Sequence, residues 1–208
     1  MLKKGIFITL EGGEGVGKTT NASYICEWME GRNIPFIATR EPGGTELSET
    51  IRGLLLDKKW QGEMTSLTEL LLVFAARAQH LEQVIKPALD AGKWVFCDRF
   101  TDATYAYQGG GRGFDEAAIQ TLETFVQHSL QPDVTLLLDL PVHIGMQRAT
   151  ARADLDRFES ENIDFFDRVR GAYLERAAQN PQRFRCIDAS QSLDDVQHEL
   201  GLYLEALL

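Results

Sequence analysis

A short glycine-rich stretch near the start of the chain has the residue types that bind polyphosphate. Residues 10–20 read LEGGEGVGKTT, and residues 12–19 fit the pattern G-x-x-x-x-G-K-[ST]. Glycines allow a tight turn whose backbone N–H groups can surround phosphate oxygens. Lys18 would then face the β- and γ-phosphates, and the hydroxyl of Thr19 would face Mg²⁺. The residues expected to bind ATP here are Gly12, Gly13, Glu14, Gly15, Val16, Gly17, Lys18, Thr19 and Thr20.

The flanking sequence supports this interpretation. An apolar run over residues 5–10 precedes the glycines, and apolar side chains follow at helical spacing, namely Ala22, Ile25, Cys26 and Met29. A phosphate-binding loop needs this order of strand, loop and helix. A purely structural glycine turn would not.

A carboxylate ends a second apolar run. Residues 94–98 read WVFCD, so Asp98 would lie at the carboxyl end of a strand, where open α/β sheets place their ligands. A carboxylate at that place can hold Mg²⁺ directly or through water. Asp139 ends another apolar run in the same way, but Asp98 is preferred because the cationic Arg99 follows it. Thr19 and Asp98 are therefore the candidate metal ligands.

Glu14 is unexpected in a loop that binds phosphate, because the bound anion repels a carboxylate. We expect its side chain to turn away from the ATP phosphates, toward a hydroxyl of a second substrate. A solvated glutamate tolerated by the loop is the alternative.

Arginines separate a phosphotransferase from a simple hydrolase. Phosphoryl transfer asks the protein mainly for positioning and for cations that meet the charge of the transferring group. The segment 148–157 reads RATARADLDR and holds Arg148, Arg152 and Arg157. It is long enough to fold over a nucleotide, so we expect a lid near residues 148–158. A solvated helix face is the alternative.

Two guanine-reading patterns are missing from the sequence: N-K-x-D does not occur, and no aspartate is followed three residues later by glycine. A guanine-dependent switch protein is therefore disfavoured, and a small kinase is favoured. A non-catalytic regulator that closes on ATP without transferring phosphate is the alternative from another class.

The pattern along the chain predicts one α/β domain over residues 1–208, with a five-stranded parallel sheet flanked by helices in three layers. We expect strands at 5–10, 34–39, 94–98, 134–139 and 184–188. Helices are expected at 46–56, from Ser66 until Pro87 kinks or ends it, at 115–130, at 162–178 and after Ser192. Residues 109–113, reading GGGRG, are expected to form a flexible loop.

Composition restricts the partners and the compartment. The net charge of −10 argues against a surface that coats nucleic acid. Neither a signal peptide nor an apolar run long enough to span a membrane is evident. The cysteines lie far apart without a C-x-x-C pair, which favours buried thiols in a reducing compartment; they are Cys26, Cys97 and Cys186. A cytoplasmic protein is expected.

Taken together, the motifs resemble those of the thymidylate kinase family. The similarity covers most of the chain and rests on LEGGEGVGKTT, TREPGGT, FAAR, CDRF, TDATYAYQGGGRG and LDLP followed by the arginine-rich segment, in the family's order. It implies the P-loop kinase fold, transfer of a phosphate from ATP to dTMP to give ADP and dTDP on the route to dTTP, dependence on Mg²⁺, and a homodimer. A kinase for another nucleoside monophosphate is the nearest alternative.

The resemblance also implies substrate-binding roles for individual residues. Glu14 would contact the sugar hydroxyl of dTMP, and Arg99 would bind its phosphate, with Arg40 bordering that site. Tyr107 would lie near the deoxyribose, where it would crowd a 2′-hydroxyl. Arg77 and Thr104 would hydrogen-bond the thymine edge, and Gln108 would follow Tyr107 at the pocket wall. Phe74 is the candidate for stacking on thymine.

This sequence departs from some relatives at two places. They carry a catalytic arginine in the loop where this chain has Gly15, so the lid would have to supply the cation, with Arg152 as first choice beside Lys18 and Arg99. Arg148 and Arg157 are its neighbours, and Arg148 would alternatively stack on adenine. The family often places a thymine-stacking phenylalanine four residues before the arginine. Here Phe74 is three before Arg77, so it either stacks on thymine from the same helix face or is an ordinary core residue.

Overall fold

The computed structural model describes residues 5–150 and 156–208. Its central element is a parallel sheet with the strand order β2-β3-β1-β4-β5. The strands are β1 (Phe7–Glu11), β2 (Phe36–Arg40), β3 (Trp94–Asp98), β4 (Val134–Asp139) and β5 (Phe184–Asp188). Leu10 of β1 is in register with Asp98 of β3, which brings the first glycine-rich residues next to that carboxylate.

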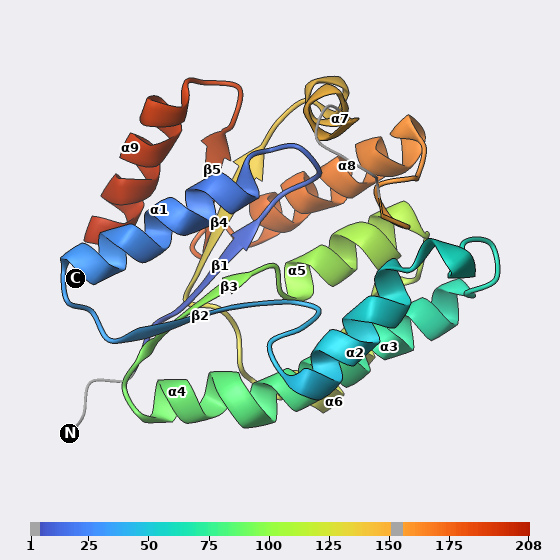
Figure 1. The fold of residues 1–208 in the computed structure, drawn as a ribbon, viewed down its shortest axis with the longest axis horizontal. Helices are drawn as coiled ribbons and strands as arrows, with labels where there is room; N and C mark the ends of the chain where they lie inside the picture. The colour runs from blue at the N-terminus through green and yellow to red at the C-terminus, as the bar shows by residue number, and fades with distance from the viewer. Residues whose placement is uncertain (1–4, 151–155) are drawn as a thin grey trace.

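Helices cover both faces of the sheet (Figure 1). They are α1 (Lys18–Gly31), α2 (Glu46–Leu56), α3 (Ser66–His80), α4 (Lys86–Asp90), α5 (Thr101–Thr104), α6 (Glu116–Gln127), α7 (Val142–Thr150), α8 (Ile163–Gln179) and α9 (Leu193–Glu205). Apolar residues of α1 and α9 pack on the face that carries Ile8 and Leu10, whereas α4 packs on the opposite face, against Phe7. Alternate residues of one buried strand thus serve two cores, which confirms the expected three-layer α/β fold.

Side-chain caps explain where several helices begin. Thr45 accepts a hydrogen bond from the backbone N–H of Ser48, Asn162 from that of Phe165, and Ser192 from that of Asp195. Each cap satisfies an N–H group that has no partner within its helix. The helix expected at 46–56 therefore has these bounds in the structure.

The glycine-rich stretch after α5 is helical, so the flexible loop expected at 109–113 is wrong. A π-helical turn covers Tyr105–Gly111, and most of its residues are buried. The glycines there allow α8 to approach closely. A Cβ on Gly110 would lie 2.7 Å from Cβ of Ala172, and one on Gly111 would lie 2.5 Å from the ring of Phe165. Glycine here serves tight packing rather than mobility.

Pro87 does not end the long helix. A π-helical turn over Leu81–Ile85 follows α3, and α4 continues from it with Pro87 in its first turn, where a backbone N–H is not needed.

The cysteines are only partly as expected. All three are free thiols, but Cys97 is buried, Cys26 is half-buried and Cys186 is exposed. Cys186 lies on β5, an edge strand of the sheet, which explains its exposure. Within residues 5–150 and 156–208, no helix combines the length and apolarity that crossing a membrane requires.

Candidate active site

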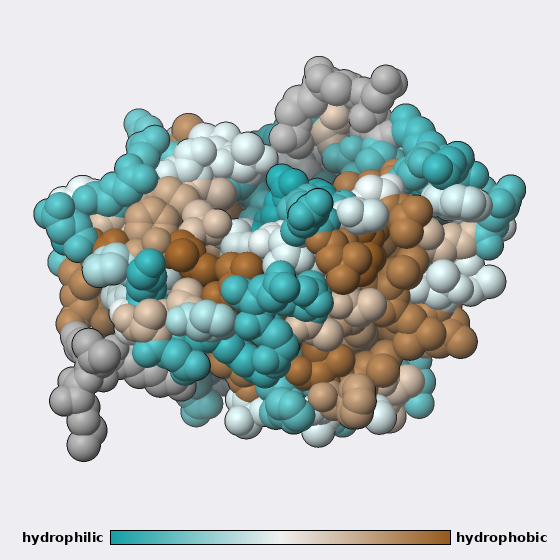
Figure 2. All heavy atoms as spheres, turned by 60° about the horizontal axis from the view of Figure 1, so that its bottom comes forward, coloured by the Kyte–Doolittle hydropathy of each residue, from teal (hydrophilic) through white to brown (hydrophobic). Residues whose placement is uncertain are grey.

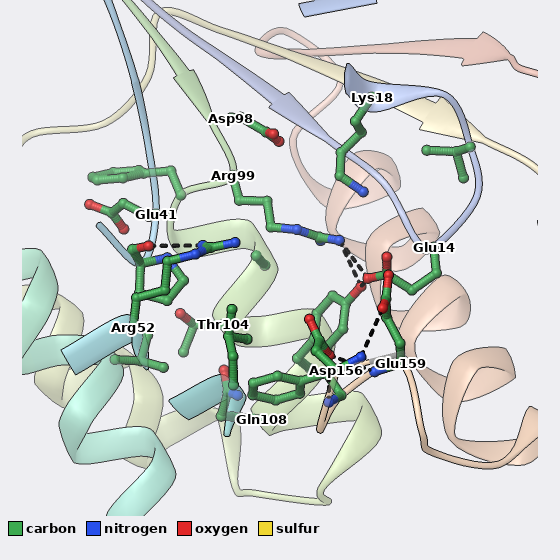
Figure 3. A pocket seen from close by; sticks show the side chains of 18 of the residues that line it. Glu14, Lys18, Glu41, Arg52, Asp98, Arg99, Thr104, Gln108, Asp156 and Glu159 are labelled. Carbon is green, nitrogen blue, oxygen red and sulfur yellow. Dashed lines mark hydrogen bonds and ion pairs between the residues drawn. The ribbon is translucent and has the colours of Figure 1, made fainter. Parts of the chain in front are cut away.

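A cavity of about 250 Å³ with converging charged side chains lies beyond the carboxyl ends of β1 and β3. Figure 3 shows Lys18 and Asp98 at one end of this cavity and Thr104 and Gln108 at the other. Segments from distant parts of the sequence therefore meet here: the loop before α1, the end of β3, and the turn that follows α5.

The glycine-rich loop leads directly into α1. Gly17 caps this helix with φ 92°, a left-handed conformation that a side chain would resist. Lys18 Nζ donates to the carbonyl oxygens of Gly13, at 2.7 Å, and Gly12, at 3.1 Å. Burial, and next the charge of Arg99, lowers the pKa of Lys18 to about 8. The ammonium group is thus held inside the loop and is poorly solvated, a condition that an anionic ligand would relieve.

Asp98 has the environment of a metal ligand. Its Oδ1 is buried and has no hydrogen-bond partner in the described part of the chain, and both Asp98 and Thr19 line the cavity. A carboxylate and a hydroxyl are oxygen donors that Mg²⁺ accepts, usually together with water and substrate phosphates. The described residues contain no group of three or more His, Cys, Asp or Glu side chains that would hold a metal alone. The site therefore fits an ion shared with a nucleotide.

The alternative acid, Asp139, is occupied elsewhere. Arg170 of α8 donates to both of its carboxylate oxygens, at 2.7 and 2.9 Å. This bidentate ion pair ties β4 to α8 through Asp139. Of the two strand-end aspartates, Asp98 is the one that lines the cavity.

Arg99 is held by a dense network next to the loop. Its Nη2 donates to Glu14 Oε1 at 2.8 Å (Figure 3) and to the Tyr107 hydroxyl at 2.9 Å. Its Nη1 donates to the Gly12 carbonyl at 2.9 Å and to the Tyr173 hydroxyl at 3.1 Å. Burial raises the pKa of Tyr107, so its phenol stays protonated and donates to Glu14 at 2.6 Å. The side chain of Glu14 is therefore turned toward Arg99 and Tyr107.

The other end of the cavity is built for hydrogen bonding to a flat polar ligand. Arg77 of α3 is almost fully buried, and its Nη2 donates to Thr104 Oγ1 at 2.9 Å while its Nε donates to Glu41 at 2.7 Å. Its Nη1 is buried without a partner among the described residues. Gln108 donates to Glu69 at 2.8 Å. Arg77, Thr104 and Gln108 all line the cavity.

Phe74 does not line the cavity. It packs in an apolar cluster with Leu70, Tyr105 and Ile119, while its neighbour Val73 lines the cavity. The reason is helical phase, because a residue four positions before Arg77 lies nearer to the direction of Arg77 than one three positions before it. The expected stacking of Phe74 on a base is corrected accordingly, and Phe74 is a core residue.

Two of the expected arginines lie away from the cavity. Arg40 is exposed and forms an ion pair with Glu49 at 2.9 Å, and it is not part of the cavity lining. Arg148, on α7, donates to the Ala189 carbonyl at 3.3 Å, at the end of β5. Thr20 is exposed on the first turn of α1.

The segment expected to form a lid, residues 148–158, is described only in part. Arg152 lies outside the described residues. Arg157 is buried; its Nε donates to the Leu55 carbonyl at 2.6 Å, and its Nη2 lies 2.7 Å from Glu69. Arg157 therefore attaches this part of the chain to α2 and α3 rather than reaching the phosphate end of the cavity.

Several lining residues were not predicted from the sequence; they are Glu41, Arg52, Val73, Asp156, Phe158 and Glu159. Glu41 lies in the TREPGGT motif, which was a usable signal. Arg52 lies on α2 and donates to the Pro42 carbonyl at 2.9 Å, a contact that depends on tertiary structure. Asp156 lies near the end of the arginine-rich segment and Glu159 follows it; their place at the cavity is visible only once the chain is folded (Figure 3).

The structure combines a parallel sheet, a glycine-rich loop before a helix, a strand-end aspartate and Arg99 beside that loop. These features define a P-loop phosphotransferase of the nucleotide kinase class. Comparison with known proteins narrows this class. The profile of the thymidylate kinase family matches residues 10–200. The chain belongs to the thymidylate kinase family, and its function is that of an ATP-dependent kinase of this family.

Individual relatives agree along nearly the whole chain. The chain is 58% identical to the thymidylate kinase of Chromohalobacter salexigens over 201 residues, which are 96% of this chain and 95% of that protein. It is 58% identical to the thymidylate kinase of Pseudomonas syringae pv. tomato over 204 residues, which are 98% of this chain and 97% of that protein. The crystal structure of the thymidylate kinase from Ehrlichia chaffeensis aligns with a TM-score of 0.78 at 34% identity, covering 97% of this chain and 99% of that one.

Proposed function

We propose that this chain transfers the γ-phosphate of ATP to the phosphate of dTMP, giving ADP and dTDP on the route to dTTP. The observation that carries the proposal is the layout of one cavity. The phosphate-binding loop and Arg99 lie at one end, and Arg77, Thr104 and Gln108 lie at the other. A nucleoside monophosphate has its phosphate and its base at opposite ends, so it can contact both ends of the cavity at once.

ATP would place its phosphates on residues 12–20. Lys18 would exchange its bonds with the Gly12 and Gly13 carbonyls for contacts with the β- and γ-phosphates. Thr19 and Asp98 would hold Mg²⁺, which when bound neutralises phosphate charge. The buried and unpartnered Oδ1 of Asp98 supports this assignment.

The monophosphate would bind with its phosphate on Arg99, whose guanidinium is fixed by Glu14, Tyr107 and Tyr173. Glu14 would turn to the sugar hydroxyl, and the ring of Tyr107 would leave no room for a 2′-hydroxyl. Arg77 Nη1 and Thr104 would donate to the base, and Gln108 would close the wall. When the acceptor phosphate arrives, Nη2 of Arg99 would exchange Glu14 for a phosphate oxygen, while Gly12 and Tyr173 keep Nη1 in place. A guanidinium held in this way favours positioning for transfer.

The lid near residues 148–158 of this single domain would supply the remaining cation. Arg152 is our first choice, because Gly15 leaves the loop without an arginine and Arg157 is committed to Glu69 and Leu55. We expect Arg152→Ala to lower kcat much more than ATP affinity, since its charge is needed mainly in the transition state. Equal losses in both would make it only a binding contact. Arg148 would lie nearer the adenine.

The test of the function is a coupled ADP-release assay with ATP and Mg²⁺, in which dTMP, dUMP, dCMP, dGMP and AMP are offered separately. Fast turnover with dTMP, slower turnover with dUMP and little with the others is the expected result. Preference for another monophosphate would still support phosphate transfer by a kinase, but it would contradict the assignment of a thymine-binding pocket. ATP binding without any product would support a regulator. Lys18→Ala, which should lose nearly all activity, is the control for the loop.

A homodimer is part of the same proposal. Apolar residues gather on the face formed by α2 and α3 (Figure 2), and four leucines there are exposed, namely Leu47, Leu54, Leu67 and Leu71. An apolar area of this kind marks an association surface. Leu71→Glu should shift the mass measured by light scattering from dimer to monomer, whereas Leu202→Glu on α9 should not. We also propose a cytoplasmic location, consistent with three unpaired thiols.

A further inference from the structure

A buried histidine at the end of α3 fixes the segment that runs from β2 toward α2. His80 has no exposed surface, and its Nε2 lies 2.7 Å from Thr39 Oγ1 while its Nδ1 lies 2.9 Å from Glu41 Oε1. Gly44 closes over the same ring, because a Cβ there would lie 2.4 Å from His80 Nε2. Thr39, Glu41 and Gly44, all from the TREPGGT motif, thus surround one imidazole.

The carboxylate of Glu41 connects this histidine to the cavity. One oxygen meets His80 Nδ1, and the other accepts from Arg77 Nε at 2.7 Å. Arg77 in turn reaches Thr104 through Nη2, which leaves Nη1 as the buried group without a partner in the described residues. Because both oxygens of Glu41 are engaged, its carboxylate has one defined orientation, and so has the guanidinium attached to it.

The protonation pattern of the ring follows from its partners. An ionised carboxylate only accepts hydrogen bonds, so Nδ1 must carry the proton that faces Glu41. In the neutral ring Nε2 then accepts from the Thr39 hydroxyl. Each polar atom of His80 has a partner, as a buried imidazole requires. His80 itself is not among the residues that line the cavity.

We propose that His80 is a positioning residue for base recognition, which acts through Glu41 to direct Nη1 of Arg77 at a carbonyl oxygen of the base. The inference rests on the proposed function, since it takes a pyrimidine monophosphate as the occupant. Without the Nδ1–H donor, Glu41 would lose one of its two fixed bonds and Arg77 would lose its defined direction. A guanidinium donates to a carbonyl but cannot accept from an exocyclic amino group, so its direction bears on the choice between thymine and cytosine.

Three substitutions separate the two contacts of the ring. His80→Asn keeps an amide N–H near the place of Nδ1, and His80→Gln keeps an amide near the place of Nε2. His80→Ala removes both. Ser192→Ala, which deletes the cap of α9 far from the cavity, is the control for a general loss of stability.

We expect His80→Ala to raise KM for dTMP by about tenfold, the effect of losing one well-directed hydrogen bond to a charged group, while KM for ATP stays within about twofold. The ratio of kcat/KM for dTMP to that for dCMP should fall. His80→Asn should recover most of both quantities, and His80→Gln should recover little. Ser192→Ala should change neither.

Equal changes in KM for dTMP and ATP, unchanged base preference, or equal recovery by Asn and Gln would overturn the proposal. If His80→Ala does not fold, the Asn and Gln variants decide alone, because both fill most of the ring's volume. If the wild-type enzyme prefers another monophosphate, the proposed function fails. A selective rise in KM for that nucleotide in His80→Gln would still support the positioning role.

Discussion

Gly15 of the phosphate-binding loop and Gly145 of α7 meet backbone to backbone. A Cβ on Gly15 would lie 1.9 Å from the Gly145 carbonyl oxygen, and a Cβ on Gly145 would lie 2.4 Å from the Glu14 carbonyl oxygen. No side chain fits at either position without moving α7 away from the loop. The close packing of α7 on this loop thus requires a residue without a side chain at position 15, which excludes an arginine there.

Gly145→Ala should therefore impair catalysis although the residue has no functional group. The added methyl would displace α7 and the arginine-rich segment that follows it. We expect kcat to fall by about tenfold or more, because small displacements of positioned groups are costly. Gly171→Ala on α8, where a Cβ would meet nothing within 4 Å, is the matched control and should keep full activity. An unchanged kcat in Gly145→Ala would show that the close packing of α7 on the loop does not affect phosphoryl transfer.

The lowered pKa of Lys18 predicts an alkaline limit. Since the pKa of Lys18 lies at about 8, the cation needed for phosphate is lost as the pH rises through this value. We expect kcat/KM for ATP to decline above pH 8, with kcat at saturating ATP affected less because bound phosphate favours the charged form. Steady-state rates between pH 6.5 and 9.5, with enzyme stability checked at each pH, give the measurement. A flat kcat/KM over this range would contradict the prediction.

Glu11 should make the fold less stable as the pH rises. Burial, and next the charge of Asp102, raises the pKa of Glu11 to about 8 from 4.5. Between these values the folded state holds a proton that the unfolded state has released, so the free energy of unfolding falls with pH, by up to ~1.4 kcal/mol per pH unit. The pKa of Asp102 is lowered by Arg183 and Arg176 against the cost of burial, so Asp102 titrates below this range.

The measurement is urea unfolding at pH 5, 6, 7 and 8 for the wild type and Glu11→Gln. Glu11 now accepts from the Phe100 N–H at 2.7 Å and from the Tyr173 hydroxyl at 2.8 Å. In Gln the amide oxygen can keep the first of these bonds, and the amide N–H can donate to the Tyr173 hydroxyl in place of the second. The variant should therefore show a flatter dependence on pH. Parallel curves for the two proteins would mean that Glu11 is ionised throughout.

Substitution of Phe74 should affect the stability of the fold, whereas substitution of Val73 should affect the KM for dTMP. Phe74→Leu should lower the free energy of unfolding by about 1–2 kcal/mol and leave KM for dTMP unchanged, because Phe74 packs in the core. Val73→Ala should raise KM for dTMP several-fold, because Val73 lines the cavity. Thermal unfolding and steady-state kinetics on both variants decide the matter. The reverse pattern would restore Phe74 as the base-stacking residue.

Patterns within a short stretch of sequence predicted most of the fold. Each strand lies within about two residues of its expected position, and α2 has the bounds expected from the sequence, Glu46–Leu56. These elements follow from local rules: alternation, helical period, caps and glycine turns. The positions of the loop, its lysine and Asp98 followed for the same reason, because the loop begins where one strand ends and Asp98 ends another. Their binding roles stay predictions.

The errors arose where tertiary contacts decide the outcome. The glycines at 109–111 indicated a loop, but in the structure they permit close contact with α8. The neighbouring residues in the sequence give no sign of this contact. The choice between Val73 and Phe74 depends on a helical phase difference of one residue. Arg157 was expected only as a neighbour of Arg152, and its burial against Leu55 and Glu69 depends on contacts with other segments. His80 gave no signal in sequence, because its role arises from three residues of another segment.

The strand order also bears on how the protein emerges from the ribosome. β1 lies in the middle of the sheet and pairs with β3 and β4, which begin at Trp94 and Val134. Its residues are entirely buried in the finished fold, so the first strand to be synthesised stays without lasting partners until much of the chain has followed. The nucleotide site therefore forms late in translation, and a nascent chain that stops before β4 exposes an apolar strand open to misassociation.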